Sequence, residues 1–288
     1  MSLNKMKILV TGADGFIGKH LCPYLSVKHE VYKVYSSPKR IKQREDIILD
    51  LTDKKAVNIY FEKFKKDVRI DIIIHLASKL ISNSEIYNLS VLYDNIKITE
   101  SIAEVAMILK PKKLINFSSI AVYPNIDGLF AETSEIRPSA NTDCLYGLSK
   151  LCGENILDFL LKDYNISICN LRISQVYGKG MREDRIIPIM LKELKEKNSI
   201  TVFGEGKRIS NFIDVNRLIK IIEYFIKNGL SGIYNIGGEH ISYFELAKRL
   251  LNEHGISSSL IKKINKGSRV KFYIDTSKIK KVKNSIKK

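Results

Sequence analysis

The sequence has little of what stabilises secreted, metal-binding or membrane proteins. It contains no tryptophan, four cysteines and five histidines, and the cysteines show no Cys-x-x-Cys spacing. We therefore expect neither a disulfide framework nor a metal site. No apolar run approaches the roughly 18 residues that a membrane-spanning helix needs, and no signal-peptide pattern is seen. These absences predict a cytoplasmic protein with no membrane partner.

Acidic residues are also scarce relative to basic ones. There are 48 Lys and Arg against 31 Asp and Glu, which gives a net charge of +17. Such a charge attracts anionic partners, either phosphate-bearing small molecules or nucleic acid. Most of these cations are lysines in short scattered clusters, whereas base reading relies on arginine. We therefore expect no specific nucleic-acid partner.

Short apolar runs alternate with helical patterns through the first two thirds of the chain. This alternation predicts βαβ units and a doubly wound parallel α/β sheet, the Rossmann arrangement. Beyond about residue 175 the pattern becomes less regular and predicts a smaller mixed α/β lobe. The predicted strands are 6–10, 30–37, 46–51, 71–78, 112–120, 166–174, 200–204 and 232–238, and the predicted helices are 53–66, 91–109, 146–162, 185–197, 214–228 and 242–254.

The stretch "TGADGFIG" directly after the first strand supplies Gly12, Gly15 and Gly18. Glycines at these places permit a tight turn, a close approach to a pyrophosphate and close packing of helix on strand. The helix N-terminus that follows offers free N–H groups to the anion. The stretch therefore predicts a dinucleotide site.

Tyr146 and Lys150 in "YGLSK" are four residues apart and share one helix face. A free phenol has a pKa near ~10 and a free lysine near ~10.4. An ammonium beside the phenol would favour the phenolate and lower the tyrosine pKa toward neutral pH. Chance pairing on an amphipathic helix is the alternative interpretation.

Further motifs follow in order: "DL" at 50–51, "HLAS" at 75–78, Asn95 in "YDNIKITES", "FSSIAVYP" at 117–124, "LRISQVYG" at 171–178 and "GIYNIGG" at 232–238. With these motifs the chain resembles the extended short-chain dehydrogenase/reductases, in particular the NAD-dependent epimerase/dehydratase family that acts on nucleotide sugars. The resemblance runs from residue 6 to about 279.

The resemblance implies an enzyme with Ser119, Tyr146 and Lys150 as catalytic residues. Tyr146 would take a proton from a sugar hydroxyl, Lys150 would lower the tyrosine pKa and hold the nicotinamide ribose, and Ser119 would bind the sugar oxygen. Cofactor contacts are expected from Gly12, Gly15, Phe16, Ile17, Gly18, Ser36, Asp50, Leu51, Leu76, Ala77, Asn95, Tyr146 and Lys150. Substrate contacts are expected from Ser119, Tyr146, Gln175, Arg208 and Arg269.

Two of these expectations carry an alternative. Asp50 could instead cap the helix that follows it. The second strand ends in "VYSSPKR", where Ser36, Ser37, Lys39 and Arg40 replace the acidic residue that accepts from an NAD ribose. The cofactor is expected to be NAD, with NADP possible.

The chain also departs from the family pattern at residues that are expected to lie near the substrate. The dehydratases of the family carry an Asp-Glu pair after the catalytic Ser or Thr, and here Ile120 and Ala121 stand there. Neither side chain can transfer a proton, so epimerase or reductase activity is expected. In the diphosphate-binding segment, Ser210 and Asn211 replace an Arg and an acidic residue. This leaves Arg208, or less favourably Lys207, to contact the phosphates.

The resulting prediction is an NAD(P)-dependent nucleotide-sugar 4-epimerase acting by hydride transfer through a 4-keto intermediate. The first alternative is an NADPH-dependent reductase of a nucleotide-linked 4-keto-6-deoxy sugar, and a more remote one is a non-catalytic NAD(P)-binding regulator. Residues 1–177 are expected to form the NAD(P)-binding domain and 178–288 mainly the substrate lobe, with parts of 211–238 returning to the first domain. A homodimer through helices 91–109 and 146–162 is expected.

Overall fold

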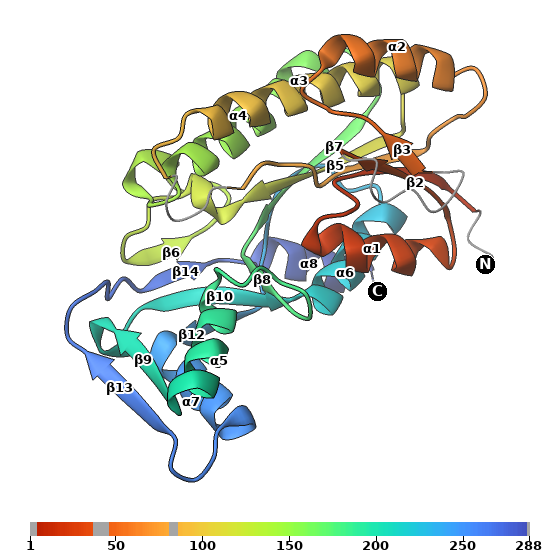
Figure 1. Ribbon diagram of the computed structural model, residues 1–288. Helices are drawn as coiled ribbons and strands as arrows, with labels where there is room; N and C mark the ends of the chain where they lie inside the picture. Colours follow the sequence, from red (N-terminus) through yellow and green to blue (C-terminus); the bar gives the residue numbers. More distant parts are fainter. Residues whose placement is uncertain (1–4, 37–45, 81–85, 287–288) are drawn as a thin grey trace.

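A computed structural model describes residues 5–36, 46–80 and 86–286. Its centre is a seven-stranded parallel sheet in the order β11-β7-β5-β4-β1-β2-β3 (Figure 1). This arrangement confirms the predicted doubly wound parallel sheet. The strands are β1 (Lys7–Thr11), β2 (Glu30–Tyr35), β3 (Asp46–Ile48), β4 (Ile72–His75), β5 (Lys113–Ser119), β7 (Ser167–Ile173) and β11 (Gly232–Ile236).

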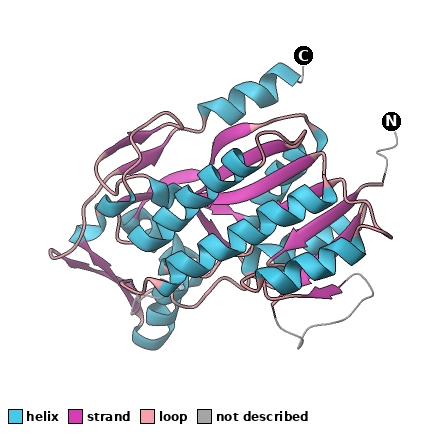
Figure 2. Ribbon diagram, turned by 90° about the horizontal axis from the view of Figure 1, so that it is seen from above, coloured by secondary structure: helices cyan, strands magenta, loops and turns pink. Residues whose placement is uncertain are grey.

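Helices cover both faces of this sheet, which explains why its central strands are apolar nearly throughout. Figure 1 shows one helical layer above the sheet and another below it, and in Figure 2 the helices run along the strands. The upper layer holds α2 (Lys54–Phe64), α3 (Ser90–Leu109) and α4 (Cys144–Leu160), and the lower layer holds α1 (Phe16–Ser26), α6 (Val215–Lys227) and α8 (Ser277–Ile286).

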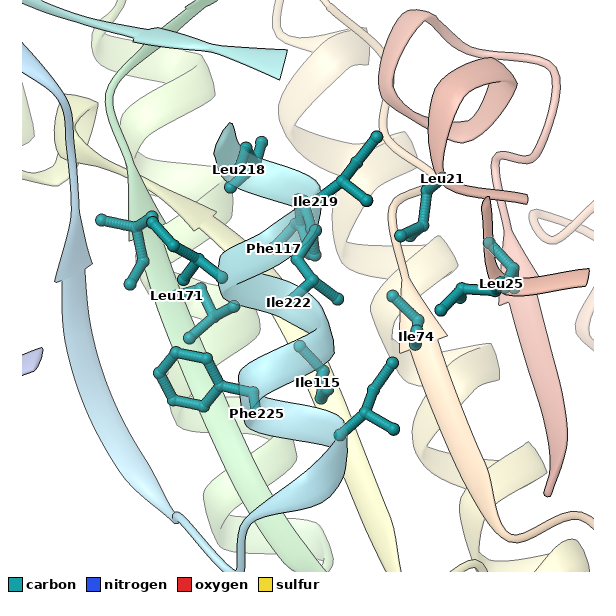
Figure 3. Packing of buried hydrophobic residues seen from close by; sticks show 14 of the residues in the cluster. Leu21, Leu25, Ile74, Ile115, Phe117, Leu171, Leu218, Ile219, Ile222 and Phe225 are labelled. Atoms are coloured by element: carbon teal, nitrogen blue, oxygen red, sulfur yellow. The ribbon is translucent and has the colours of Figure 1, made fainter. Parts of the chain in front are cut away.

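The core beneath the sheet forms around α6. Leu218, Ile222 and Phe225 of this helix pack toward Ile115 and Leu171 of the strands (Figure 3). All five side chains are fully buried. Burying a side chain of this size contributes about 1.5–3 kcal/mol, so α6 is held mainly by its apolar face.

Polar groups fix both ends of α6. Asp214 caps its N-terminus and accepts from the N–H groups of Asn216 at 2.9 Å and Arg217 at 3.1 Å. At the other end the buried Lys113 ammonium donates to the carbonyl of Phe225 at 2.7 Å. A cation at the carboxyl end of a helix satisfies carbonyls that lack a partner within the helix.

The second lobe is built from small sheets and two helices. One sheet has the order β12-β10-β8, and β13 pairs with β9 and β14 with β6. The elements are β6 (Gly128–Phe130), β8 (Gln175–Tyr177), α5 (Ile186–Lys197), β9 (Ser199–Phe203), β10 (Ile209–Asp214), β12 (Glu239–Ser242), α7 (Tyr243–His254), β13 (Leu260–Ile264) and β14 (Phe272–Ile274), with short 3-10 turns η2 (Ile120–Val122), η3 (Pro138–Ala140) and η4 (Gly204–Gly206).

The chain crosses between the two parts more than once. After β10 it enters α6, and β11 then pairs with β7 in the main sheet. The boundaries of the two domains remain a prediction. Two expected strands are shorter than predicted: 46–51 is β3 only to Ile48, and 71–78 is β4 only to His75, because the following residues turn away to line a groove.

The structure also contains elements that the sequence pattern did not predict. These are the strands β6, β8, β10, β12, β13 and β14, the helix α8 and the three 3-10 turns. None of the helices within the described ranges is long and apolar enough to cross a membrane.

The Glu223 carboxylate links α6 to α1. It accepts from Lys227 at 2.8 Å, from Lys28 at 3.2 Å and from the Tyr24 hydroxyl. Burial alone would raise the pKa of Glu223, but the hydrogen bonds from Lys227, Tyr24 and Lys28 outweigh burial and lower the pKa to about 2.

Replacing Glu223 by Gln should therefore destabilise the protein in a pH-dependent way. A carboxyl whose pKa falls on folding contributes stability above its unfolded pKa of about 4.3, and this contribution is lost as the pH falls through the folded value. We expect Glu223→Gln to cost about 1–2 kcal/mol at pH 7, and the cost should decline below about pH 4 and become small only below about pH 2. Urea unfolding across this range measures it.

Glu62→Gln is the matched control, because Glu62 pairs with Lys65 at the exposed surface of α2. It should change the stability by less than about 0.5 kcal/mol. A loss in Glu223→Gln that does not depend on pH would contradict the proposed role of the charge.

Candidate active site

The glycine turn lies between β1 and α1 and forms the floor of a groove. Gly12 has a φ of 66°, and a Cβ there would lie 2.7 Å from the Ala77 nitrogen. A Cβ on Gly18 would lie 2.5 Å from the Gly12 carbonyl oxygen. Larger residues at either place would push the turn away from β4 or from α1. The N-terminus of α1 therefore opens into the groove, as an anion site requires.

This first groove has a volume of about 400 Å³ and runs along the carboxyl ends of β1, β2 and β4. A dinucleotide is bound at this edge in folds of this kind. All but one of the predicted cofactor residues line it. They are Gly12, Gly15, Phe16, Ile17, Gly18, Ser36, Asp50, Leu51, Leu76, Ala77, Tyr146 and Lys150.

Asn95 is the exception and does not line the groove. Its buried amide accepts from the Lys79 N–H at 2.7 Å and from the Ser78 hydroxyl at 3.1 Å, and it donates to Ser149 Oγ at 3.1 Å. Asn95 thus joins α3 to α4 and to the loop after β4. It holds the groove wall from behind, and a direct contact between Asn95 and the cofactor stays a prediction.

Asp50 lines the groove and does not cap α2. Asp50 Oδ1 accepts from the N–H and the hydroxyl of Thr52, both at 2.8 Å. The cap of α2 is Asp53, which accepts from the Ala56 N–H at 3.0 Å. Ser37, Lys39 and Arg40, the other residues expected near the cofactor ribose, lie outside the described residues.

Tyr146 and Lys150 lie on one face of α4, with the Lys150 Nζ 5.6 Å from the centre of the tyrosine ring. Burial raises the pKa of Tyr146 to about 12, helped by Asp143 and opposed by Arg185 and by a hydrogen bond with Ser78. Burial lowers the pKa of Lys150 to about 8, opposed by Glu154. The expectation that Lys150, together with the positive charge of the cofactor, lowers the tyrosine pKa stays a prediction.

Ser119 ends β5 and lies beside this pair. Its hydroxyl accepts from the Ala121 N–H at 3.1 Å and caps the short turn η2. A Cβ on Gly147 would lie 2.2 Å from the Ala121 carbonyl oxygen, so only glycine lets η2 pack this closely on α4. Gly147 thereby lets η2, and Ser119 before it, lie close to the side of α4 that carries Tyr146 and Lys150.

A second groove of about 440 Å³ meets the first at Ser119 and Tyr146. Gln175 and Arg208 also line it, as predicted for substrate residues. Arg208 lies 5.7 Å from the Tyr243 ring centre and donates to Asn125 Oδ1 at 3.4 Å. Its buried Nε has no partner among the described residues, so it is available to an anionic ligand.

Arg269 does not line this groove, which corrects the prediction that it contacts substrate. It pairs with Glu205 at 3.3 Å and donates to Asn265 on the exposed surface of the second lobe. Lys207, the weaker phosphate candidate, also pairs with Glu205, at 2.6 Å. Both cations thus belong to a surface cluster.

The sequence analysis missed several residues of the second groove. Arg182 and Arg185 line it on either side of Asp184, which pairs with both guanidinium groups. Ser174 lines both grooves, and its buried hydroxyl has no partner in the described part of the chain. The charged run "MREDR", two residues after "VYG", was the available signal.

His75 is a structural residue. It is buried at the end of β4, and its Nδ1 lies 2.8 Å from the Thr11 hydroxyl. Burial and the nearby Lys150 lower the pKa of His75 to about 3, so the ring is neutral. Within the described residues no group of His, Cys, Asp and Glu could hold a metal ion.

A family model described as the NAD dependent epimerase/dehydratase family matches residues 8–237. The chain belongs to this family. Among solved structures, UDP-glucuronic acid 4-epimerase from Bacillus cereus in complex with NAD is similar, with 26% identity, a TM-score of 0.77, and coverage of 96% of this chain and 89% of that one. MoeE5 in complex with UDP-glucose and NAD, at 24% identity and a TM-score of 0.78, covers 96% and 91% and shares the fold.

Curated relatives in the family carry names for different reactions. A dTDP-D-glucose 4,6-dehydratase of Dictyostelium discoideum is 28% identical over 85% of this chain and 62% of its own length. The dTDP-4-dehydro-6-deoxyglucose reductase of Escherichia coli is 27% identical over 87% and 82%. The uncharacterized UDP-glucose epimerase YtcB of Bacillus subtilis is 29% identical over 81% and 77%. This chain thus spans under two thirds of the first of these relatives.

A buried ion pair joins α4 to β7 in this member of the epimerase/dehydratase family. Arg172 of β7 donates to Glu154 of α4 at 2.7 and 3.0 Å, and the two side chains are 1% and 3% exposed. Ser118 donates to the same carboxylate, and Arg172 also donates to the Tyr123 hydroxyl at 3.0 Å. Every polar group in this network therefore has a partner.

Breaking this pair should destabilise the protein strongly. Arg172→Met leaves the Glu154 carboxylate buried and unpaired, which costs about 3–5 kcal/mol. Removing both charges in Arg172→Met with Glu154→Leu should recover most of that loss, because desolvation then has no charge to penalise. Chemical unfolding of the single and double variants measures the difference. A double variant as unstable as the sum of the single variants would refute this account.

Proposed function

We propose that this protein is an NAD-dependent nucleotide-sugar epimerase of the 4-epimerase type. The observation that carries the proposal is the meeting of two grooves at Tyr146 and Ser119. The first groove has the glycine turn and helix N-terminus that fit the pyrophosphate of NAD. The second has arginine side chains that suit the diphosphate of a nucleotide sugar.

NAD, when bound, supplies a hydride acceptor and donor and a positively charged ring. The chain itself supplies proton transfer and positioning. Tyr146 takes the proton of the sugar hydroxyl and returns it, and Ser119 hydrogen-bonds the same sugar oxygen. Gly12, Gly15 and the first turn of α1 hold the pyrophosphate, while Lys150 lies where it can hold the nicotinamide ribose.

The pKa values explain why Tyr146 needs several positive charges around it. Burial raises the pKa of its phenol to about 12, so the group is protonated at neutral pH. Lys150 has a pKa of about 8 and keeps its proton below that pH. The ammonium, the Arg185 guanidinium and the cofactor's ring together favour the phenolate at the moment of proton transfer.

The residues at 120 and 121 argue against dehydration, although several relatives are named dehydratases. Loss of water from the sugar needs an acid and a base besides Tyr146. Ile120 and Ala121 stand in η2 beside the catalytic face, and neither side chain can carry a proton. An epimerase needs no further acid or base, because Tyr146 serves in both directions.

A reductase of a nucleotide-linked 4-keto sugar is the second candidate. The described end of β2 favours it, since Tyr35 and Ser36 supply no acidic group to an NAD ribose. The similarity to the Escherichia coli reductase points the same way. A non-catalytic regulator has less support, because Tyr146, Lys150 and Ser119 all line the grooves.

Product analysis distinguishes these reactions. The purified protein is incubated with UDP-glucose, UDP-glucuronic acid or dTDP-glucose and NAD, without a reductant, and the sugars are examined by NMR. We expect one of these substrates to yield its C4 epimer. A 4-keto-6-deoxy product would show dehydration, and turnover of a 4-keto sugar only with added NADPH would show a reductase.

Tyr146→Phe tests the catalytic assignment in the same assay. The variant loses the proton-transfer group, so turnover should fall by about 10²–10⁴-fold. Binding of NADH, followed by its fluorescence, should change by no more than a few-fold. Unchanged turnover in Tyr146→Phe would refute the role of Tyr146 even if the wild type is an epimerase.

We also propose that two copies associate through α3 and α4. Tyr93 of α3 is 56% exposed and Phe159 of α4 is 67% exposed, and both helices form an outer surface of the main sheet (Figure 1). Large exposed apolar side chains on adjacent helices suit a subunit interface.

Phe159→Asp should therefore convert a dimer into a monomer, since it places a charge in an apolar contact. Size-exclusion chromatography with light scattering gives the mass. Ile59→Asp on α2, at a side chain that is 51% exposed, is the control and should leave the dimer intact. A monomeric wild-type protein would refute the proposed interface.

A further inference from the structure

The two grooves meet at a junction, which we define by the residues that line both of them. These residues are the apolar Phe16, Leu80, Ile173 and Val176 and the polar Ser119, Tyr146 and Ser174. The proposed reaction gives Ser119 and Tyr146 a role at the sugar oxygen. Ser174 is the polar side chain of the junction to which that reaction gives no role.

The Ser174 side chain lacks a partner of its own within the protein. The residue is 6% exposed, and its buried hydroxyl has no hydrogen-bond partner among the described residues. Six buried side-chain atoms in the described ranges are without a partner, and only those of Ser174 and Arg208 belong to residues that line either groove. Because a buried polar group without a partner costs free energy, we expect a ligand to satisfy these two.

The backbone of Ser174 is held on both sides. The residue stands between β7, which ends at Ile173, and β8, which begins at Gln175. Its N–H donates to the Ile236 carbonyl of β11 at 2.9 Å, and Gln175 pairs with Phe212 of β10. A serine hydroxyl moves between its staggered positions by rotation about the Cα–Cβ bond alone. The hydroxyl can therefore turn toward a group that enters the junction while the backbone stays in place.

The chemistry of the junction favours the cofactor's nicotinamide as this group. The apolar side chains of the junction provide walls between which a flat aromatic ring fits. The sugar oxygen already has two partners in the proposed reaction, Tyr146 and Ser119. A carboxamide, such as the one that the nicotinamide ring carries, has both a donor and an acceptor. It can therefore satisfy the Ser174 hydroxyl in either direction.

We propose that the Ser174 hydroxyl binds the nicotinamide carboxamide and thereby sets which face of the ring is turned toward the sugar. Apolar walls alone would accept the ring in two orientations that differ by a half-turn about its bond to the ribose. A hydrogen bond from Ser174 favours one of them, because the carboxamide lies on one side of the ring. Fixing this orientation keeps the reacting carbon of the ring next to the sugar.

The inference rests on the proposed function for its cofactor, and binding to the nucleotide-free protein tests it apart from activity. NADH carries the nicotinamide, whereas ADP-ribose has the same pyrophosphate and lacks that ring. Isothermal titration calorimetry gives the two dissociation constants. Ser174→Ala should weaken the binding of NADH by about 3- to 10-fold and leave that of ADP-ribose within about twofold, because one hydrogen bond to the nicotinamide is lost.

Thermal unfolding adds a measurement that a structural role of Ser174 would move in the opposite direction. Without nucleotide, Ser174→Ala should unfold at the same temperature as the wild type or higher, because it removes a buried hydroxyl that has no partner. Saturating NADH should raise the unfolding temperature of the variant less than that of the wild type, because ligand binding stabilises in proportion to affinity.

Ser199→Ala is the matched control. Ser199 begins β9, lines neither groove, and also has a buried hydroxyl without a partner in the described part of the chain. This variant should leave both dissociation constants within about twofold of the wild-type values.

The possible outcomes separate the inference from the function on which it rests. If wild-type protein binds neither NADH nor ADP-ribose, the proposed function fails. If it binds both and Ser174→Ala leaves the affinity for NADH unchanged, or weakens both ligands equally, the inference is refuted. A lower unfolding temperature of nucleotide-free Ser174→Ala would show a structural partner of the hydroxyl and would also count against it. If NADH binding is unchanged but the NAD-loaded variant binds UDP-glucose more weakly, the hydroxyl serves the sugar and the inference is wrong.

Discussion

The buried pair of Glu154 and Arg172 is the interaction that holds α4, and with it Tyr146 and Lys150, in place on the sheet. Glu154 lies one helical turn after Lys150 on α4, and Arg172 lies in β7, between β5 and the edge strand β11. Two charges taken out of water are tolerable only when each has its partner and its remaining hydrogen bonds. Because Glu154 and Arg172 must both keep their hydrogen bonds, α4 has little freedom to shift along the sheet.

The same pair also fixes the neighbouring groups. Ser118 binds the Glu154 carboxylate and precedes Ser119, so the end of β5 is tied to α4. Tyr123 binds Arg172 and, through its hydroxyl, Asn235 of β11 at 2.8 Å. The network thus runs from the edge strand β11 to the neighbourhood of Lys150. It offsets part of the effect of burial on that lysine, because Glu154 raises the pKa of Lys150.

The sequence was sufficient to predict those parts of the site whose residues lie close together in the chain. The first strand, the glycine turn and α1 are neighbours in the chain, and their spacing alone requires close backbone packing. Tyr146 and Lys150 share a helix, so their spacing determines that they share a face. Most of the predicted cofactor residues line the first groove, whereas Asn95 lies behind its wall and holds the loop after β4.

The second groove could not be predicted in this way, because it depends on how two lobes pack. Arg269 and Arg208 are both basic residues in the second lobe, but only Arg208 faces the groove. Arg182 and Arg185 reach it from a loop without regular structure, whose course no periodicity describes. The shortened β3 and β4 have the same origin, since their last predicted residues leave the sheet to line a site.

The electrostatic effects in this molecule therefore depend on where each charge lies more than on the net charge. Lysines dominate the excess of +17, yet many of them pair with carboxylates at the surface, as Lys207 does with Glu205. The second groove instead holds arginines, of which Arg208 keeps a buried Nε without a partner among the described residues. A buried unpaired donor costs free energy until a ligand satisfies it. The proposed recognition of an anion thus rests first on Arg208, because Arg182 and Arg185 already pair with Asp184. The surrounding lysines add only a screened, long-range attraction.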